Sequence, residues 1–119
     1  MGFADAIKSG FSNYVNFNGR SLRSAYWYWA LFSVIATIIL AIIDAKVIGA
    51  SVTQGLFGLA TLLPGIAVSV RRLHDTDRSG WWLLIGLIPL IGPILLIVWM
   101  AGEGTAGANR FGPPAPTGP

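Results

Sequence analysis

Residues 24–43, with the sequence SAYWYWALFSVIATIILAII, contain no charged side chain over 20 consecutive positions. An α-helix rises about 1.5 Å per residue, so about 20 apolar residues cross a hydrocarbon core about 30 Å thick. Two further uncharged runs follow at 47–70 and 79–102, each 24 residues long. We therefore predict an all-α, helical integral membrane protein with apolar helical segments at about 25–43, 50–70 and 80–101.

The composition excludes an ordinary soluble domain. Of the 119 residues, 54% are hydrophobic and 11% are charged, whereas a soluble domain carries roughly a quarter of its residues as charged side chains. The net charge is +3, but the basic residues flank apolar runs, which indicates membrane anchors and no nucleic-acid partner. The chain has no cysteine, so disulfides, thiolate nucleophiles and cysteine-ligated metals are excluded.

The N-terminal segment carries a regular apolar pattern. Phe3, Ile7, Phe11 and Tyr14 follow one another at spacings of four, four and three residues, which predicts an amphipathic helix over about 3–17. Such a helix lies in the membrane interface with its polar face toward the headgroups, or packs on the membrane helices as ordinary core. The pattern leaves both arrangements open.

The second run carries a stripe of small residues. If the run is one helix, a single face presents Ser51, Gly55, Gly58, Leu62, Gly65 and Ser69. Small residues allow helices to approach closely in lipid, where apolarity alone does not drive association. We predict a helix-packing face formed by Ser51, Gly55, Gly58, Gly65 and Ser69. The partner of this face is another helix of the chain or a second subunit.

The third run contains Pro89 and Pro93. It forms either one Pro-kinked span or a re-entrant hairpin that turns at 90–92, and the single span is favoured because each hairpin arm is too short to cross. We expect residues 1–101 to form a single membrane domain. Residues 102–119 are rich in Gly and Pro and are expected to form a flexible tail.

Aromatic residues and charges suggest how the chain sits in the membrane. Amphipathic rings prefer the headgroup level, and the expected interface belt comprises Tyr26, Trp27, Trp29, Trp81, Trp82 and Trp99. With three spans, six basic residues lie on the side of the N-terminus and two on the other; with a hairpin, the counts are seven and one. Both counts predict a cytoplasmic N-terminus.

The segment between the second and third runs, 71–78, holds six ionisable side chains in eight residues. Anchoring and helix capping explain such a segment: the arginines end one helix, and Thr76 or Asp77 caps the next. The sharper interpretation combines its arginines with Arg20 and Arg23 into a face that binds phosphate, because guanidinium groups make forked hydrogen bonds to phosphate and attract anionic headgroups.

The same segment also contains His74 beside Asp75, which raises the question of catalysis. A single histidine without a nearby cysteine, glutamate or second histidine is a poor zinc ligand set. The chain also lacks a recognisable arrangement of nucleophile, base and orienting group. We therefore expect no catalytic, cofactor-binding or metal-binding residues, and no enzyme.

Several motifs together resemble one known family. They are Gly19-Arg20 with Arg23, Tyr26-Trp27, the whole stretch RRLHDTDRSGWW at 71–82, and Gly107 followed by NRFGP at 109–113. This set is similar to the domain-of-unknown-function 805 family of small bacterial inner-membrane proteins. The resemblance implies a multi-pass protein of the bacterial inner (cytoplasmic) membrane and brings no settled activity. Within it, Arg110 and Phe111 are expected to dock on the protein or on lipid.

We predict a non-enzymatic inner-membrane protein, an oligomeric or adaptor module whose Arg-rich cytoplasmic face contacts anionic phospholipid headgroups or a partner protein. The partners expected are membrane lipids together with a second copy or another membrane protein. The candidate contact residues are Arg20, Arg23, Arg71, Arg72, His74, Asp75, Asp77, Arg78, Asn109 and Arg110. The alternative is an oligomeric pore-former or transporter subunit of holin-like type, disfavoured because the apolar runs contain no ionisable residue.

Overall fold

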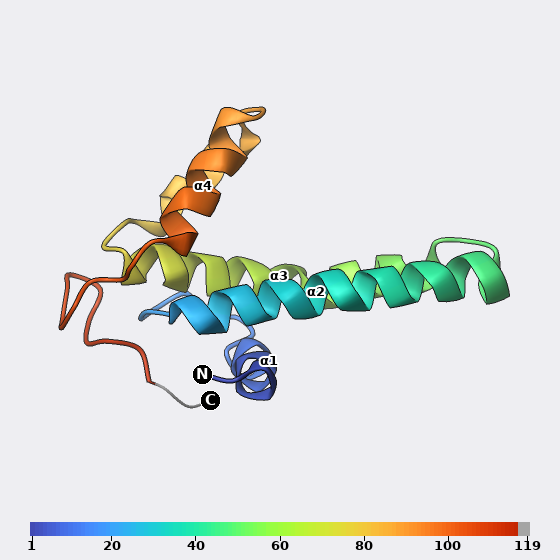
Figure 1. Cartoon of the computed structure of the whole chain (residues 1–119), viewed down its shortest axis with the longest axis horizontal. Helices are drawn as coiled ribbons and strands as arrows, with labels where there is room; N and C mark the ends of the chain where they lie inside the picture. Colours follow the sequence, from blue (N-terminus) through green and yellow to red (C-terminus); the bar gives the residue numbers. More distant parts are fainter. Residues whose placement is uncertain (117–119) are drawn as a thin grey trace.

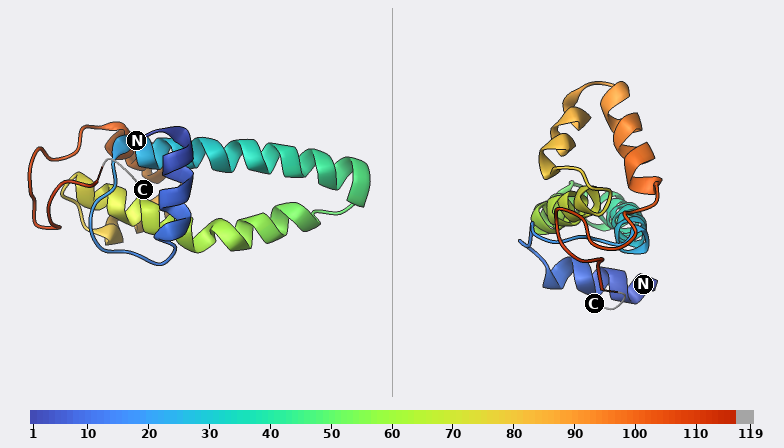
Figure 2. Two further views of the ribbon diagram at one scale, coloured as in Figure 1. Left: turned by 90° about the horizontal axis from the view of Figure 1, so that it is seen from below. Right: turned by 90° about the vertical axis from the view of Figure 1, so that its left-hand side faces the viewer.

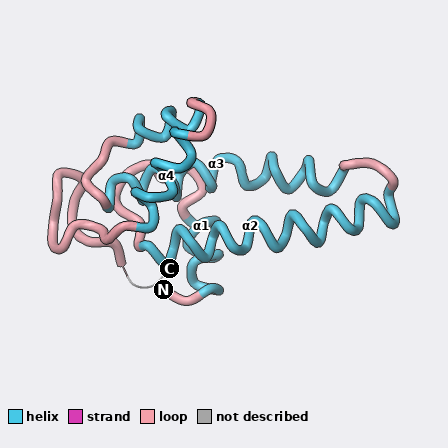
Figure 3. The backbone as a smooth tube through the Cα atoms, turned by 45° about the horizontal axis from the view of Figure 1, so that its top comes forward, coloured by secondary structure: helices cyan, strands magenta, loops and turns pink. Residues whose placement is uncertain are grey.

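The computed structural model describes residues 1–116 and is built of helices and loops, with no strand in that part of the chain (Figures 1 and 3). The order of elements is α1 Phe3–Ser12, α2 Arg23–Ile43, the π-helical turn η1 Asp44–Ile48, α3 Val52–Asp75, the 3₁₀ helix η2 Gly80–Leu87, and α4 Ile91–Ala101. The all-α prediction is confirmed.

Helices α2 and α3 form a long pair that runs side by side along the 49 Å axis of the molecule (Figure 1). Both are long and apolar enough to cross a membrane: the most apolar 18-residue stretch has a mean hydropathy of 2.3 within Arg23–Ile48 and of 1.4 within Val52–Asp75. Their outer faces are apolar, with Ile38 55% exposed and Leu59 72% exposed. A helix that is hydrophobic on faces that no protein covers requires a hydrocarbon environment.

A buried carboxylate closes the turn between these two helices. The Asp44 side chain accepts hydrogen bonds from the backbone N–H groups of Thr53 and Gln54, both at 3.0 Å, and from the Thr53 hydroxyl at 2.8 Å. It thereby satisfies backbone donors at the start of α3, which have no partner within the helix itself. Gly49 turns the chain with a φ of 79°, in the left-handed region that glycine adopts without strain.

The third apolar segment is a hairpin of two short helices, η2 and α4, and is not one continuous helix. The chain reverses at Pro89 and Leu90, where Leu90 has a φ of 67°. Pro93 falls in the first turn of α4, where a helix needs no backbone N–H. Gly92 lies against the backbone of η2 so closely that a Cβ atom would overlap the Ile85 carbonyl. The single kinked span favoured from the sequence is therefore replaced by the hairpin alternative.

Helix α1 and the hairpin lie on opposite sides of the α2–α3 pair, and α1 crosses both helices (Figure 2). Gly10 allows α1 to approach α2, because a Cβ atom at this position would overlap the ring of Trp29. Phe11 packs edge-on against Trp29, with ring centroids 5.1 Å apart. Trp29 is only 4% exposed, so it belongs to the core and not to the interface belt expected from the sequence.

The amphipathic helix α1 packs on the α2–α3 pair with one face and leaves its outer face exposed. Phe3 and Phe11 remain 40% and 41% exposed, so part of its apolar stripe faces away from the chain. The helix ends at Ser12, earlier than the predicted 17. Asn13 ends it, because both the backbone N–H and the side-chain amide of Asn13 donate to the Ser9 carbonyl.

Helix α3 continues to Asp75, five residues beyond the predicted end at 70. Arg71 and Arg72 are therefore helical residues, and the connection to η2 is shorter than expected. The cap of η2 is Ser79, whose hydroxyl accepts a hydrogen bond from the backbone N–H of Trp81. Thr76, one of the two predicted caps of the following helix, closes the end of α3 instead, because its hydroxyl donates to the Leu73 carbonyl.

The hairpin returns the chain after α4 to the half of the molecule that holds α1 (Figure 1). Seven of the eight basic residues lie on that half, and Lys46, in η1, lies at the opposite end of the α2–α3 pair. Membrane proteins retain Lys and Arg on the cytoplasmic side. This half is therefore expected to face the cytoplasm.

Cysteine labelling tests this topology, because the chain has no native cysteine. Ala50→Cys lies in the turn between α2 and α3, and Ala108→Cys lies in the C-terminal segment; both positions are exposed. In intact cells a membrane-impermeant thiol reagent is expected to label Ala50→Cys, and to label Ala108→Cys only after lysis. The cysteine-free parent is the control. Labelling of both positions in intact cells would contradict the hairpin topology.

Candidate functional site

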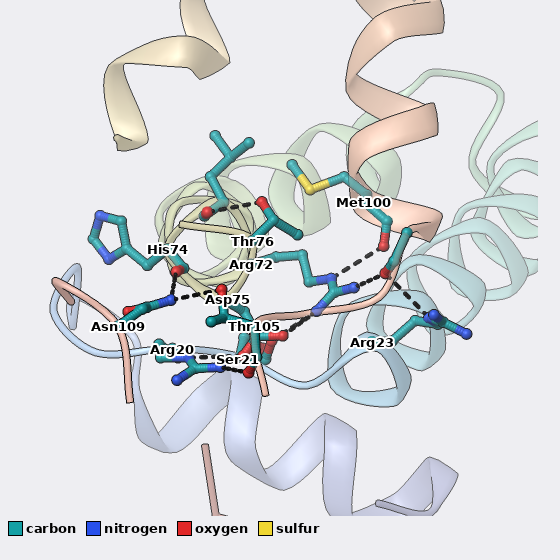
Figure 4. Close-up of polar contacts among 12 residues, drawn as sticks. Arg20, Ser21, Arg23, Arg72, His74, Asp75, Thr76, Met100, Thr105 and Asn109 are labelled. Carbon is teal, nitrogen blue, oxygen red and sulfur yellow. Dashed lines mark hydrogen bonds and ion pairs between the residues drawn. The ribbon is translucent and has the colours of Figure 1, made fainter. Parts of the chain in front are cut away.

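The centre of the polar half is a buried carboxylate held between two arginines (Figure 4). Asp75, in the last turn of α3, accepts from the Arg20 Nε at 2.9 Å through one oxygen and from Arg72 through the other. The three residues are at most 6% exposed. Burial of charges is costly unless they are paired and hydrogen-bonded, and each member of this cluster meets that condition.

The same two arginines hold the C-terminal segment on the bundle. Arg20 donates to the carbonyls of Thr105 and Gly107, each at 2.5 Å. Arg72 donates to the carbonyls of Met100 at 3.0 Å and Gly102 at 2.5 Å. Residues 100–107 therefore wrap around the cluster, whereas the composition predicted a flexible tail from residue 102. Residues 117–119, the end of that predicted tail, lie outside the described residues.

Close approach of the segment depends on one glycine. Gly104 passes so near to Asp75 that a Cβ atom would overlap the carboxylate. The neighbouring Thr105 N–H donates to the Asp75 carbonyl at 2.7 Å. The acidic residue thus binds two arginines through its side chain and the C-terminal segment through its backbone.

The family-like motif at 109–113 docks on the end of α3. The Asn109 amide donates to the His74 carbonyl at 2.9 Å, and the ring of Phe111 stacks on the His74 ring at 4.1 Å with an interplanar angle of 5°. The His74 Nδ1 lies 2.9 Å from the Gly19 carbonyl, which can only accept, so Nδ1 carries the proton. Arg110 pairs with Asp77 at 3.2 Å on the surface.

Arg71 is the one buried arginine on this half without a carboxylate partner in residues 1–116. Its Nη1 donates to the Asn13 carbonyl at 3.3 Å and the Asn16 carbonyl at 2.7 Å, and its own carbonyl accepts from the Ser21 N–H at 3.0 Å. It thus fixes the loop between α1 and α2 on α3. It also leaves the cluster with more buried positive than negative charge.

The ten candidate contact residues consequently divide into three groups. Buried and bonded inside the chain are Arg20, Arg71, Arg72 and Asp75. Residues that hold one segment on another are His74, Asn109 and Arg78, whose guanidinium lies 4.5 Å from the centre of the Trp99 ring and so joins the hairpin to the end of α3. Exposed residues are Arg23, Asp77 and Arg110, of which Arg23 donates from its Nε to the Gly102 carbonyl at 3.3 Å (Figure 4).

The predicted packing stripe faces an open groove. Gly58, Gly65 and Ser69 line a groove of about 430 Å³ between α2 and α3, beneath Leu83 of η2. Within residues 1–116 and apart from the adjoining backbone of α3 itself, no atom lies within 4 Å of a Cβ placed on Gly55 or Gly58. The described chain therefore leaves this part of the stripe uncovered.

Among the other predicted belt residues, Trp81 is 79% exposed and Trp82 is 49% exposed, while the rings of Trp82 and Trp99 pack edge-on with centroids 5.7 Å apart. The Trp27 indole donates to the Met100 carbonyl at 3.2 Å. These rings surround the base of the hairpin, close to the arginine cluster. The searched residues contain no group of three or more His, Cys, Asp or Glu side chains able to hold a metal.

Removal of the Asp75 charge is expected to destabilise the protein far more than removal of the neighbouring Asp77 charge. Asp75→Asn leaves two buried arginines without a counter-charge and is expected to lower the free energy of unfolding by about 3 to 5 kcal/mol. Asp77→Asn breaks a pair whose side chains are 61% and 48% exposed, so a loss of about 0 to 1 kcal/mol is expected. Unfolding in detergent micelles measures both; equal losses would contradict a central role for Asp75.

Comparison with known proteins identifies the family of the chain. The chain matches a family model described as "Protein of unknown function (DUF805)" over residues 14–113. It is 44% identical over 106 residues to inner membrane protein YhaH of Escherichia coli (strain K12), covering 85% of this chain and 88% of the relative. No solved structure matches the chain.

Two further relatives from the same organism extend the similarity. Inner membrane protein YhaI is 44% identical over 102 residues, covering 84% of this chain and 86% of the relative. Uncharacterized protein YiiR is 30% identical over 122 residues, with coverages of 82% and 84%. The matched region includes the arginine cluster and the docked motif at 109–113, and the resemblance predicted from those motifs is confirmed. The chain therefore belongs to the DUF805 family, whose relatives include small inner-membrane proteins.

Proposed function

We propose that this protein is a non-enzymatic module of the inner membrane whose polar half, facing the cytoplasm, binds anionic phospholipid headgroups. The observation that carries this proposal is the charge of that half. Seven basic side chains on that half face four acidic ones, Asp5, Asp75, Asp77 and Glu103. Three of the arginines are buried there against the one buried carboxylate of Asp75, and the exposed cations are Lys8, Arg23 and Arg110, the last of which is paired with Asp77. Basic clusters beside membrane spans attract anionic lipids.

The shape of the polar half supports contact with the membrane surface. Helix α1 lies across one side of the α2–α3 pair, and the hairpin projects from the opposite side (Figure 2). Both expose apolar side chains, including Phe3 at 40% and Leu87 at 81%. Elements of this kind are suited to the boundary between headgroups and acyl chains, where the nearby cations reach phosphate groups.

We also propose that the protein forms a homo-oligomer through the groove beside Gly58 and Gly65. A Cβ atom at Gly58 would meet no other element of the described chain, and one at Gly65 would meet only the Trp29 indole nitrogen at 3.8 Å, so the groove leaves room for a helix of a second copy to approach closely. A pore or transporter subunit has less support, because the stretches 24–43 of α2 and 52–70 of α3 contain no ionisable side chain.

Anionic-lipid enrichment tests the proposed function. Substitution of glutamine for Lys8, Arg23 and Arg110 is expected to lower the ratio of phosphatidylglycerol to phosphatidylethanolamine that co-purifies, by about fivefold per charge, since each cation near an anionic surface contributes about 1 kcal/mol. Native mass spectrometry measures the bound lipids. Lys46→Gln, at the opposite end of the α2–α3 pair, is the matched control and should leave the ratio unchanged. An unchanged ratio in the triple variant would contradict the proposal.

The oligomer is tested with Gly58→Leu. Because the described chain leaves open space at Gly58, the larger side chain should not disturb the fold of one subunit, but it should prevent close approach of a second helix. We expect weaker association in crosslinking and in size-exclusion chromatography, with an unchanged melting temperature of the monomer. Thr37→Leu, on an exposed face of α2, is the control. Assembly equal to that of the parent would show that the stripe is not the interface.

A further inference from the structure

A cavity of about 260 Å³ lies beside Arg71, between α1, the loop that follows it and the C-terminal segment. Its polar lining includes Arg20 and Arg71 together with the asparagines Asn13, Asn16 and Asn18, and Pro113–Pro116 close one side. No aspartate or glutamate is among its described lining residues. The cavity thus combines two guanidinium groups with neutral hydrogen-bonding side chains.

Arg71 has hydrogen-bonding capacity that the described chain does not use. A guanidinium group has five N–H donors, and Nη1 uses its two on the carbonyls of Asn13 and Asn16. The three N–H donors on Nε and Nη2 have no partner in residues 1–116. The residue is 4% exposed, and no fully buried side-chain nitrogen or oxygen in the described chain lacks a partner. The free donors are therefore accessible, and the cavity is the space that Arg71 lines.

A buried guanidinium group with three free N–H donors and no carboxylate partner is suited to bind an anion. Adjacent N–H groups on Nε and Nη2 present the planar fork that pairs with two oxygens of one phosphate or carboxylate. The cavity is far larger than the roughly 30 Å³ of one water molecule, so it has room for a tetrahedral group with substituents. Arg20, already paired with Asp75, adds positive potential to the same cavity.

We propose that this cavity is a binding site for a phosphate group, with Arg71 as its principal ligand. This inference rests on the proposed function, and it names the cavity in which the phosphate group of the ligand binds. Asn13 and Asn16 contribute backbone carbonyls that orient Arg71, and Asn18 lies at the cavity with a side chain that makes no hydrogen bond within the described residues. The phosphate is carried by an anionic phospholipid or is free in solution.

The test places a negative charge in the cavity without removing Arg71, which also fixes a loop. Asn18 is exposed and only its backbone N–H is bonded, to the Asn16 side chain at 3.1 Å, so Asn18→Asp keeps the fold. Ala108→Asp introduces the same charge at an exposed position outside the cavity. Delipidated protein in neutral detergent is titrated with phosphatidylglycerol in one arm and with inorganic phosphate in the other, and native mass spectrometry counts the one-to-one adducts.

We expect Asn18→Asp to weaken binding about tenfold or more, because the new carboxylate repels the anion and competes with it for the guanidinium groups, while Ala108→Asp binds as the parent does. Arg71→Gln should give the same loss if it folds. A loss seen with phosphatidylglycerol alone supports a lipid-borne phosphate, and a loss seen with inorganic phosphate supports the free anion.

Two results would overturn the site. If Asn18→Asp binds both probes as the parent does while the triple variant of Lys8, Arg23 and Arg110 loses anionic lipid, the cavity is not the phosphate site, and the proposed function stands. If the parent binds neither probe, both the site and the proposed function are wrong.

Discussion

The carboxylate of Asp75 is the group on which the polar half of the molecule depends. Each of its oxygens faces an arginine, and those arginines in turn bind the carbonyls of the C-terminal segment. Without the carboxylate, Arg20 and Arg72 would be two buried like charges, and the cost of burying them would oppose docking of the segment. One acidic side chain therefore allows three parts of the chain to meet: the loop before α2, the end of α3 and the segment after α4.

The hairpin of η2 and α4 brings the C-terminal segment back to Asp75 and its arginines. A continuous third span would carry Gly102 to the far side of the membrane, about 30 Å from Arg72. Reversal at Pro89 and Leu90 instead returns the chain to the end of α3, where Arg78 holds Trp99. The result is an asymmetric molecule: the far end of α2 and α3 is closed by Asp44 and carries one basic residue, Lys46, whereas the near end carries the other seven basic residues. The excess of buried arginine over buried carboxylate at this end is the physical basis for the anion binding that we propose.

The sequence by itself determined the features that depend on local chemistry. Uncharged runs of 20 to 24 residues required helices in hydrocarbon, and both long helices formed where the runs predicted them. The motif residues at 71–82 and 109–113 identified the family, and the spacing of Phe3, Ile7 and Phe11 gave α1. The predicted helix ends were less accurate. Asn13 and the arginines of α3 determine where α1 and α3 end through hydrogen bonds that a periodic pattern does not reveal.

Only the tertiary structure decided which charges are free. Arg20, Arg71 and Arg72 are indistinguishable from Arg23 in the sequence, yet the first three are buried and bonded while Arg23 is exposed. The local sequence pattern also could not decide between a single span and a hairpin, because Pro89 and Pro93 permit both. It depended on contacts between residues far apart, such as Arg20 with Thr105. The side-chain types fixed what the charged groups can bind, and the long-range hydrogen bonds fixed which of them remain available to bind it.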